Sequence, residues 1–144
     1  NFNMSGGTIR DNQADNGGVY GIGGGVGVDG GNFSMSGGTI RDNTASNRGG
    51  GVYVNSGTFS MSGGTIHDNT ATIGDGGGVY VDSGGTFTKS GGTIYGAPDS
   101  NANIAGGAGQ AAYALGKGRK ESTAWPGDIL DSSISHPGGG WDFP

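Results

Sequence analysis

Short runs of apolar residues recur along the chain, and within each run apolar and polar residues alternate. The run Thr58–Met61 reads Thr-Phe-Ser-Met, and the run Val52–Val54 reads Val-Tyr-Val. Alternation with a period of two is typical of a β-strand that buries one face. Gly, Ser and Asn separate the runs, which predicts short strands joined by tight turns.

These runs belong to a segment that occurs four times, in copies starting near residues 1, 32, 58 and 86. The distance from Phe to Ile is seven residues in every copy, whereas successive phenylalanines lie 31, 26 and 28 residues apart. The length variation falls after the Asn that follows Ile, which is typical of loops on one side of a repeat array. We define these variable loops as residues 12–24, 44–49, 70–76 and 96–110.

A single repeat cannot bury its apolar residues alone, so we expect successive copies to stack with like residues about 4.8 Å apart. The predicted fold is an all-β parallel β-helix (β-solenoid) with three short strands per coil and about four to five coils. A β-propeller needs longer repeats, of about 40–50 residues, and a β-sandwich does not require near-identical units. The predicted core ladder consists of Phe2, Phe33, Phe59, Phe87, Met4, Met35, Met61, Ile9, Ile40, Ile66, Ile94, Val26, Val28, Val52, Val54, Val79 and Val81.

The sequence also predicts an asparagine ladder at the turns and a closing segment at the end of the array. Asn12, Asn43 and Asn69 follow the Ile of their repeats and predict a stacked ladder at one corner, where Asn tolerates a left-handed backbone. We assign residues 1–116 to the β-helix repeats and residues 117–144 to a C-terminal closing segment and tail. Within the repeats, residues 96–110 are predicted to be a loop and Ala111–Leu115 the last inward strand.

Composition narrows the class of protein. Glycine contributes 37 of 144 residues, but it does not recur at every third position, which excludes collagen. No apolar run approaches the roughly 18 residues of a membrane-spanning helix. The net charge is −5, which argues against nucleic-acid binding, and the absence of cysteine excludes disulfides. The chain begins within a repeat, so we interpret it as a processed protein or a fragment.

The segment Ile66–Val81 resembles repeats of bacterial surface proteins, which are abundant among the exported proteins of spirochaetes and gut bacteria. It is also similar to the GGAI and FxxN repeats of chlamydial polymorphic outer-membrane proteins, with Ile in place of Phe before the Asn. The segment Lys117–Gly127 resembles the part that closes such arrays. The resemblance implies a right-handed β-helix, secretion and a surface or adhesive role, and it implies no catalytic residues.

Candidate chemical sites have competing interpretations. A column of Asp11, Asp42 and Asp68, beside Arg10, Arg41 and His67, could bind Ca²⁺ through oxygen ligands or could be an exposed face of mixed charge. A second column of Asp29, Asn55 and Asp82 resembles the calcium sites of polysaccharide lyases with this fold, and rows of threonine could bind ice. We predict no enzyme activity, no cofactor and no metal site, and keep a lyase or an ice-binding protein as alternatives.

The remaining candidates concern assembly. Tyr53, Tyr80 and Tyr113 are predicted to form an outward column that either stabilises the sheet or offers a platform for glycan or a neighbouring molecule. Trp141 and Phe143, after a run of glycines, either cover the core or reach a neighbour. The first coil shows no cap, so its strand edges could template end-to-end association. We therefore expect an extracellular or cell-surface structural protein of a bacterium that forms filaments, or alternatively an adhesin whose variable loops bind a host glycan or protein.

Overall fold

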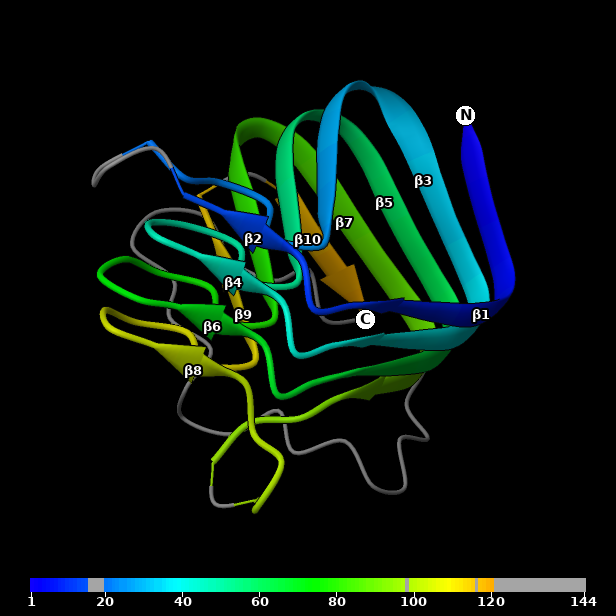
Figure 1. The fold of residues 1–144 in the computed structure, drawn as a ribbon. Coiled ribbons are helices and arrows are strands. Elements are labelled where there is room, and N and C mark those ends of the chain that lie inside the picture. The colour runs from blue at the N-terminus through cyan, green and yellow to red at the C-terminus, as the bar shows by residue number, and fades with distance from the viewer. Residues whose placement is uncertain (16–19, 98, 116, 121–144) are drawn as a thin grey trace.

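The chain winds into a β-solenoid of parallel strands with about three turns (Figure 1). This computed structural model describes residues 1–15, 20–97, 99–115 and, for the backbone alone, 117–120. The described residues contain ten strands and no helix. The strands are β1 (Phe2–Arg10), β2 (Gln13–Ala14), β3 (Val26–Arg41), β4 (Thr44–Ala45), β5 (Val52–His67), β6 (Thr70–Ala71), β7 (Val79–Ile94), β8 (Ile104–Ala105), β9 (Ala112–Ala114) and β10 (Lys117–Lys120).

Two parallel sheets run the length of the solenoid. One has the order β1-β3-β5-β7-β10, with β9 also paired to β7, and the other has the order β2-β4-β6-β8. We call the successive coils A (β1 and β2), B (β3 and β4), C (β5 and β6) and D (β7 and β8). The predicted β-solenoid is confirmed, with about three turns where four to five coils were expected.

The division of each coil into strands differs from the prediction. The three short runs expected in a coil lie within one strand of 16 residues, and a separate two-residue strand follows it. In Figure 1 the strands β3, β5 and β7 bend to cover more than one side of the coil. The bends coincide with register shifts after Val28 and Met35 in β3, so the strand turns at bulges without losing its partner.

Glycine is required at the second bulge because of a close approach between coils. Gly64 has a φ of 86°, in the left-handed region, and a side chain there would collide with the Met35 Cε methyl and the Gly38 carbonyl of the preceding coil. Gly38 and Gly92 repeat this arrangement with Met4 and Met61. Each methionine methyl group therefore occupies the space that a side chain on the glycine of the next coil would need. The bulge thus packs directly against the core.

Identical side chains stack on one another through the core. Phe33 pairs in register with Phe59, and Phe59 with Phe87, and their ring centroids lie 4.8 and 4.9 Å apart. Most of the predicted core ladder is buried; Ile9 and Val26 are only partly buried, and Phe2 is 49% exposed although it stacks on Phe33 at 5.1 Å. These three belong to or face coil A, where no further described coil covers them.

The fourth repeat departs from the predicted loop at 96–110. Asn103 comes nine residues after Ile94, whereas Asn69 comes three residues after Ile66. An insertion therefore separates Asn103 from the Ile that precedes the asparagine in the other repeats. After the insertion the chain returns to the stack: β8 pairs with β6, and Asn103 is fully buried. The predicted last inward strand is present as β9, whose residues are buried.

Replacing Phe59 by Ser should unfold the protein or cost about 3–5 kcal/mol of unfolding free energy, since it removes a fully buried ring and buries an unpaired hydroxyl. Urea denaturation followed by circular dichroism measures the loss. Ser60→Ala, at the outward-facing neighbouring position, is the control and should change stability by at most about 0.5 kcal/mol. A Phe59→Ser protein as stable as the control would contradict the stacked core.

Candidate functional site

A continuous ladder of asparagine side chains runs along one corner of the solenoid. The Nδ2 atoms of Asn12, Asn43 and Asn69 each donate to the Oδ1 of the next asparagine, at 2.9, 2.9 and 2.8 Å. The ladder ends at Asn103, which the sequence analysis missed because of the insertion before it. Each Oδ1 also accepts the backbone N–H of the asparagine one coil before it.

The inner asparagines of the ladder satisfy backbone groups as well as each other. Asn69 donates through Nδ2 to the carbonyl oxygens of Ile40 and His67, at 3.0 and 2.9 Å. Asn43 makes the equivalent bonds to Ile9 and Arg41. Because buried polar groups cost free energy unless they are hydrogen-bonded, these inner asparagines act as structural elements, with their amides engaged by the stack.

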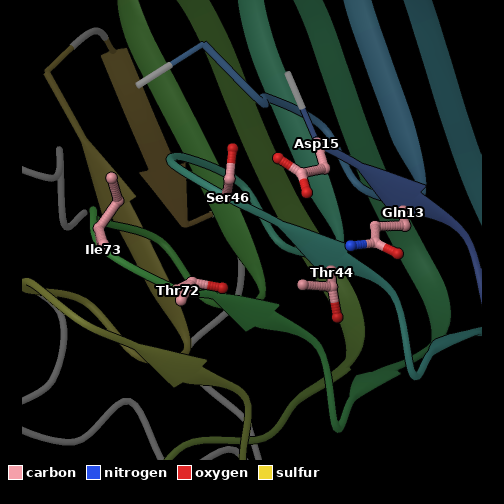
Figure 2. Close-up of a pocket in the computed structure, with 6 residues that line it drawn as sticks. All are labelled: Gln13, Asp15, Thr44, Ser46, Thr72 and Ile73. Atoms are coloured by element: carbon pink, nitrogen blue, oxygen red, sulfur yellow. The ribbon is translucent and has the colours of Figure 1, made fainter. Parts of the chain in front are cut away.

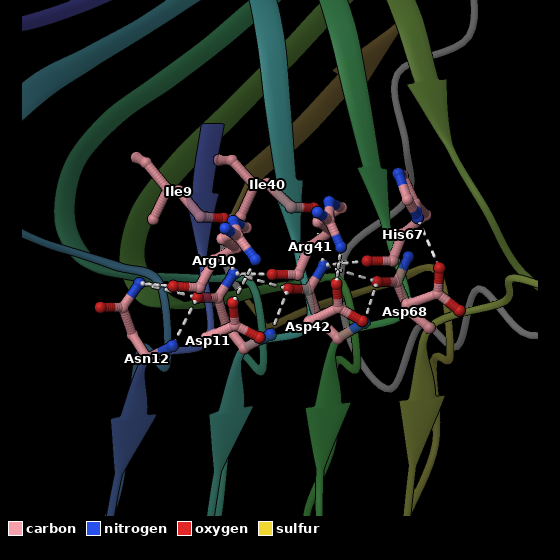
Figure 3. A network of polar contacts seen from close by, with 12 residues as sticks. Ile9, Arg10, Asp11, Asn12, Ile40, Arg41, Asp42, His67 and Asp68 are labelled. Atoms are coloured by element: carbon pink, nitrogen blue, oxygen red, sulfur yellow. Dashed lines mark hydrogen bonds and ion pairs between the residues drawn. The ribbon is translucent and has the colours of Figure 1, made fainter. Parts of the chain in front are cut away.

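The aspartate before each asparagine takes the left-handed backbone conformation that had been predicted for the asparagine. Asp11, Asp42 and Asp68 have φ values of 58°, 53° and 52°. This turn directs the following asparagine inward and the aspartate outward. Each aspartate pairs with the basic residue before it: Arg10 with Asp11 at 2.8 Å, Arg41 with Asp42, and His67 Nδ1 with Asp68 at 2.6 Å (Figure 3).

The two acidic columns are occupied by neighbouring side chains. Asp29 accepts hydrogen bonds from Asn55 Nδ2 at 3.0 Å and Ser56 Oγ at 3.1 Å, and Asp82 accepts one from the Tyr53 hydroxyl at 2.8 Å. Among the described residues, no three His, Cys, Asp or Glu side chains are grouped so that they could hold a metal ion.

The tyrosine column lies beneath the surface, which corrects its predicted exposure and favours, of its two predicted roles, the stabilisation of the sheet by stacking. Tyr53, Tyr80 and Tyr113 are 7%, 0% and 8% exposed, and their rings stack with centroids 5.5 and 5.3 Å apart. Ala108, in the fourth variable loop, packs against the column, and the Arg48 guanidinium lies 5.0 Å from the Tyr80 ring centroid. The chain after β4 and the chain after β8 therefore help to cover these rings, which leaves little of them exposed for surface contacts.

The tyrosine hydroxyls differ in their hydrogen bonding. Tyr53 donates to Asp82, and burial together with this bond raises the pKa of Tyr53 to about 12. Burial raises the pKa of Asp82, but hydrogen bonds from the Ser83 N–H and Tyr53 outweigh it, so that pKa lies below its ordinary value. The Tyr80 hydroxyl is buried and has no hydrogen-bonding partner among the described residues. Burial raises the pKa of Tyr80 to about 12, although Arg48 partly opposes the shift.

Lys89 is a core residue that the repeat pattern did not predict. It occupies the column of Met4, Met35 and Met61 in coil D and is 1% exposed. Its Nζ donates to the Gly92 carbonyl at 2.7 Å. The only signal in the sequence was the Lys at this place in the fourth copy.

A shallow groove, whose exposed surface is mostly apolar although most of its lining residues are polar, crosses the second sheet and the start of the loops that follow it (Figure 2). Gln13 and Thr44 contribute from β2 and β4, and Asp15, Ser46, Thr72 and Ile73 contribute from the residues just after β2, β4 and β6. Ile73 is 56% exposed. The groove therefore combines the variable loops with a row of polar side chains.

A second groove lies at the end of the solenoid that carries coil A. β1 pairs with β3 only from Phe33 onward, so residues 26–32 of β3 have β5 on one side and no described strand on the other. Phe2, Val26–Asp29, Asn32 and Phe33 line the groove at this open edge. Two of the predicted assembly residues, Trp141 and Phe143, lie outside the described residues.

Comparison with known proteins finds no matching family model, no matching curated protein and no matching solved structure. The described part of the chain also contains no helix that could cross a membrane.

Replacing Asn69 by Ala should lower the unfolding free energy by about 3 kcal/mol or more. The substitution leaves the buried donors of Asn43 without their acceptor and leaves two buried carbonyl oxygens without their donor. The same substitution at Asn12, at the exposed end of the ladder, should cost about 1 kcal/mol. Both losses are read from urea denaturation midpoints. Equal losses at the two positions would show that the ladder is not the stabilising unit.

Tyr80→Phe should raise the unfolding free energy by about 1 kcal/mol at pH 7, because it removes a buried hydroxyl without a partner. Tyr53→Phe is the matched control and should lower it, because it breaks the bond to Asp82. A loss of stability in Tyr80→Phe comparable to that in Tyr53→Phe would contradict the geometry.

The raised pKa of Tyr80 also predicts an alkaline effect. A raised folded-state pKa stabilises the protein fully below the unfolded value of about 10, and this contribution is lost as the pH rises through about 12. Denaturation between pH 9 and 12 should therefore show a smaller fall in stability for Tyr80→Phe than for the unmodified chain. An identical fall in both proteins would be the contrary result.

Proposed function

We propose that this chain is a non-enzymatic structural protein of the bacterial surface or extracellular matrix, and that it stacks end to end into fibres. We further propose a right-handed coil with three short strand segments per turn, closed after residue 117 by a C-terminal cap. Extracellular placement follows from the resemblance of the repeats to those of exported bacterial proteins.

The assembly proposal is supported by the edge of β3 at coil A, where no described strand pairs with residues 26–32. Phe2 is 49% exposed, whereas Phe33, the same residue one coil further in, is 1% exposed. An apolar surface combined with an unpaired strand edge favours the addition of another strand. A further coil placed there would bury Phe2 and pair the edge of Val26–Asn32.

The opposite end offers a matching surface. β9 and β10 lie on the far side of β7 in the same parallel sheet, and they follow the register of the coils before them. We further propose that the C-terminal cap leaves the outer edge of β10 open, so that this edge in one copy continues the sheet at β1 of the next. A contact between two different ends of the molecule does not close on itself, so it generates a filament.

The polar side chains support a structural role over a catalytic one. Asp29 and Asp82 are engaged with Asn55, Ser56 and Tyr53, and the outward aspartates pair with the basic residue beside them. Such bonds leave these carboxylates without the paired acid and base that a polysaccharide lyase requires.

The groove in Figure 2 favours an adhesin as the second candidate function. Its polar side chains come from the variable loops and from the sheet beside them, so loop changes would alter its shape while the core stays constant. Hydroxyl, amide and carboxylate groups of this kind suit the hydroxyl groups of a glycan.

Negative-stain electron microscopy of the unmodified chain at high concentration should show fibres as wide as one solenoid. Phe2→Lys should abolish them, because it places a charge on the open apolar edge. Ile73→Lys, at an equally exposed apolar residue away from both ends, is the control and should leave them unchanged. Single particles under all conditions would refute the assembly and favour the adhesin.

A further inference from the structure

Two tyrosines of the buried column differ in what their hydroxyl groups contact. The Tyr53 hydroxyl donates a hydrogen bond of 2.8 Å to Asp82 Oδ2, whereas the Tyr80 hydroxyl has no hydrogen-bonding partner among the described residues. Both side chains are buried, and their rings stack on each other with centroids 5.5 Å apart. One ring of this pair is therefore coupled to a carboxylate, and the other is not.

The register of the repeats explains the difference. Tyr53 pairs with Tyr80, and Asp82 follows Tyr80 by two residues, so the carboxylate reaches the Tyr53 hydroxyl from the next coil. Tyr80 pairs in turn with Tyr113, and the residue two positions after Tyr113 is Leu115. A leucine side chain cannot accept a hydrogen bond. The contact with a carboxylate thus belongs to one coil, although the tyrosine recurs.

Asp82 is held in place and charged for this contact. The Ser83 backbone N–H donates to Asp82 Oδ1 at 2.7 Å, while Asp82 Oδ2 faces Tyr53. Burial acts to raise the pKa of Asp82, but hydrogen bonds from Ser83 and Tyr53 outweigh it, so the carboxylate is ionised at neutral pH. Burial raises the pKa of Tyr53 to about 12, so its hydroxyl keeps its proton. The pair is thus an acid and a base within the distance needed for proton transfer.

A base beside a buried phenol changes what happens when the phenol loses an electron. A phenol that has lost one electron is a strong acid and carries a positive charge, which is costly where water is excluded. Transfer of the proton to a carboxylate leaves a neutral phenoxyl radical and a neutral carboxylic acid. Tyr80 has no such base among the described residues, and the Arg48 guanidinium, 5.0 Å from its ring centroid, further disfavours a positive charge there.

We propose that Tyr53 is a site of reversible one-electron oxidation, with Asp82 as its proton acceptor. The substrate is a one-electron oxidant, such as an oxidising metal complex or a free radical. One electron passes from the Tyr53 ring to the oxidant, the phenolic O–H bond breaks, and the proton moves to Asp82 Oδ2. A one-electron reductant reverses the reaction, because the proton returns from Asp82 to the phenolate oxygen when the electron is restored.

The burial of Tyr53 protects the radical from side reactions. Only 7% of this residue is exposed, and Tyr80 covers one face of its ring. A radical on a second molecule therefore has little access to the ring carbons, and coupling of two molecules through a carbon–carbon bond is disfavoured. Electron transfer does not need contact with the ring, so a reductant can still restore the site.

Flash photolysis tests the site, with tris(bipyridine)ruthenium(III) as an oxidant that takes one electron to become ruthenium(II). The full-length chain carries four substitutions that leave the stacked column as its only tyrosines and remove its tryptophans: Tyr20→Phe, Tyr95→Phe, Trp125→Phe and Trp141→Phe. In this parent protein we expect a phenoxyl radical in the electron paramagnetic resonance spectrum. Its formation should be slower in D₂O than in H₂O, because the proton moves with the electron.

Two variants of the parent protein separate the acid–base pair from the rest of the column. Asp82→Asn keeps the shape of the side chain but cannot take a proton, so it should slow radical formation by about 100-fold and abolish the solvent isotope effect. Tyr80→Phe removes a hydroxyl that has no such base, and it should leave both unchanged. Equal rates in Asp82→Asn and the parent protein would refute proton transfer to Asp82.

A transplanted carboxylate provides the converse test. Tyr53→Phe should abolish the rapid radical formation, and a radical at full yield in that variant would exclude Tyr53 as the site. Adding Leu115→Asp places a carboxylate one coil beyond Tyr80, where Asp82 lies relative to Tyr53, and should restore the rapid formation and its isotope effect. Leu115 is 40% exposed, so the polar side chain can be accommodated.

Leu115→Asn in the same Tyr53→Phe protein is the matched control, and it should not restore the radical. Restoration by both Leu115 variants, or by neither, would show that a carboxylate acceptor does not determine where oxidation occurs. Circular dichroism establishes that each variant is folded. If Asp82→Asn does not fold, the Leu115 pair still decides, because it leaves Asp82 in place.

Discussion

The parallel register between successive coils is the constraint on which the rest of the structure depends. It places each phenylalanine on the phenylalanine of the coil before it, with ring centroids 4.8–5.1 Å apart. This separation is close to the spacing of paired strands, so backbone hydrogen bonding and ring stacking are satisfied by one geometry. The asparagine ladder obeys the same geometry, because a side-chain amide can both donate and accept along a column. A shift of register by one residue would disrupt the apolar and polar columns together.

The candidate functional surfaces lie at residues that are not stacked on like residues of a neighbouring coil. Within the stack, side chains are engaged by their copies in the neighbouring coils. At coil A the described part of the column ends, and Phe2 and Val26–Val28 present apolar surface and backbone that no described strand pairs on that side. The groove beside β2, β4 and β6 is the other exception, because the loops there differ in length and sequence from coil to coil. The edge proposed for assembly and the groove proposed for ligand binding therefore lie in different parts of the molecule.

The sequence predicted the solenoid because the distance from Phe to Ile is constant and the apolar residues alternate. It did not predict Asn103, since an insertion after Tyr95 moved that residue out of the repeat pattern while three-dimensional stacking restored its place. It also placed the tyrosines on the surface, because alternation shows which side of a strand faces outward and cannot show that a later loop covers that side. The open groove could not be read from composition, since it depends on where the pairing of β1 with β3 begins.

Lys89 distinguishes the fourth repeat from the three repeats before it. In the coils before it, a methionine reaches into the glycine hollow of the following coil, whereas Lys89 directs its ammonium to a carbonyl of its own coil. The last repeat is thus chemically unlike those it copies, and moving it to the middle would place a cation where a methyl group is needed. The described coils are therefore not interchangeable, although their backbones follow the same register.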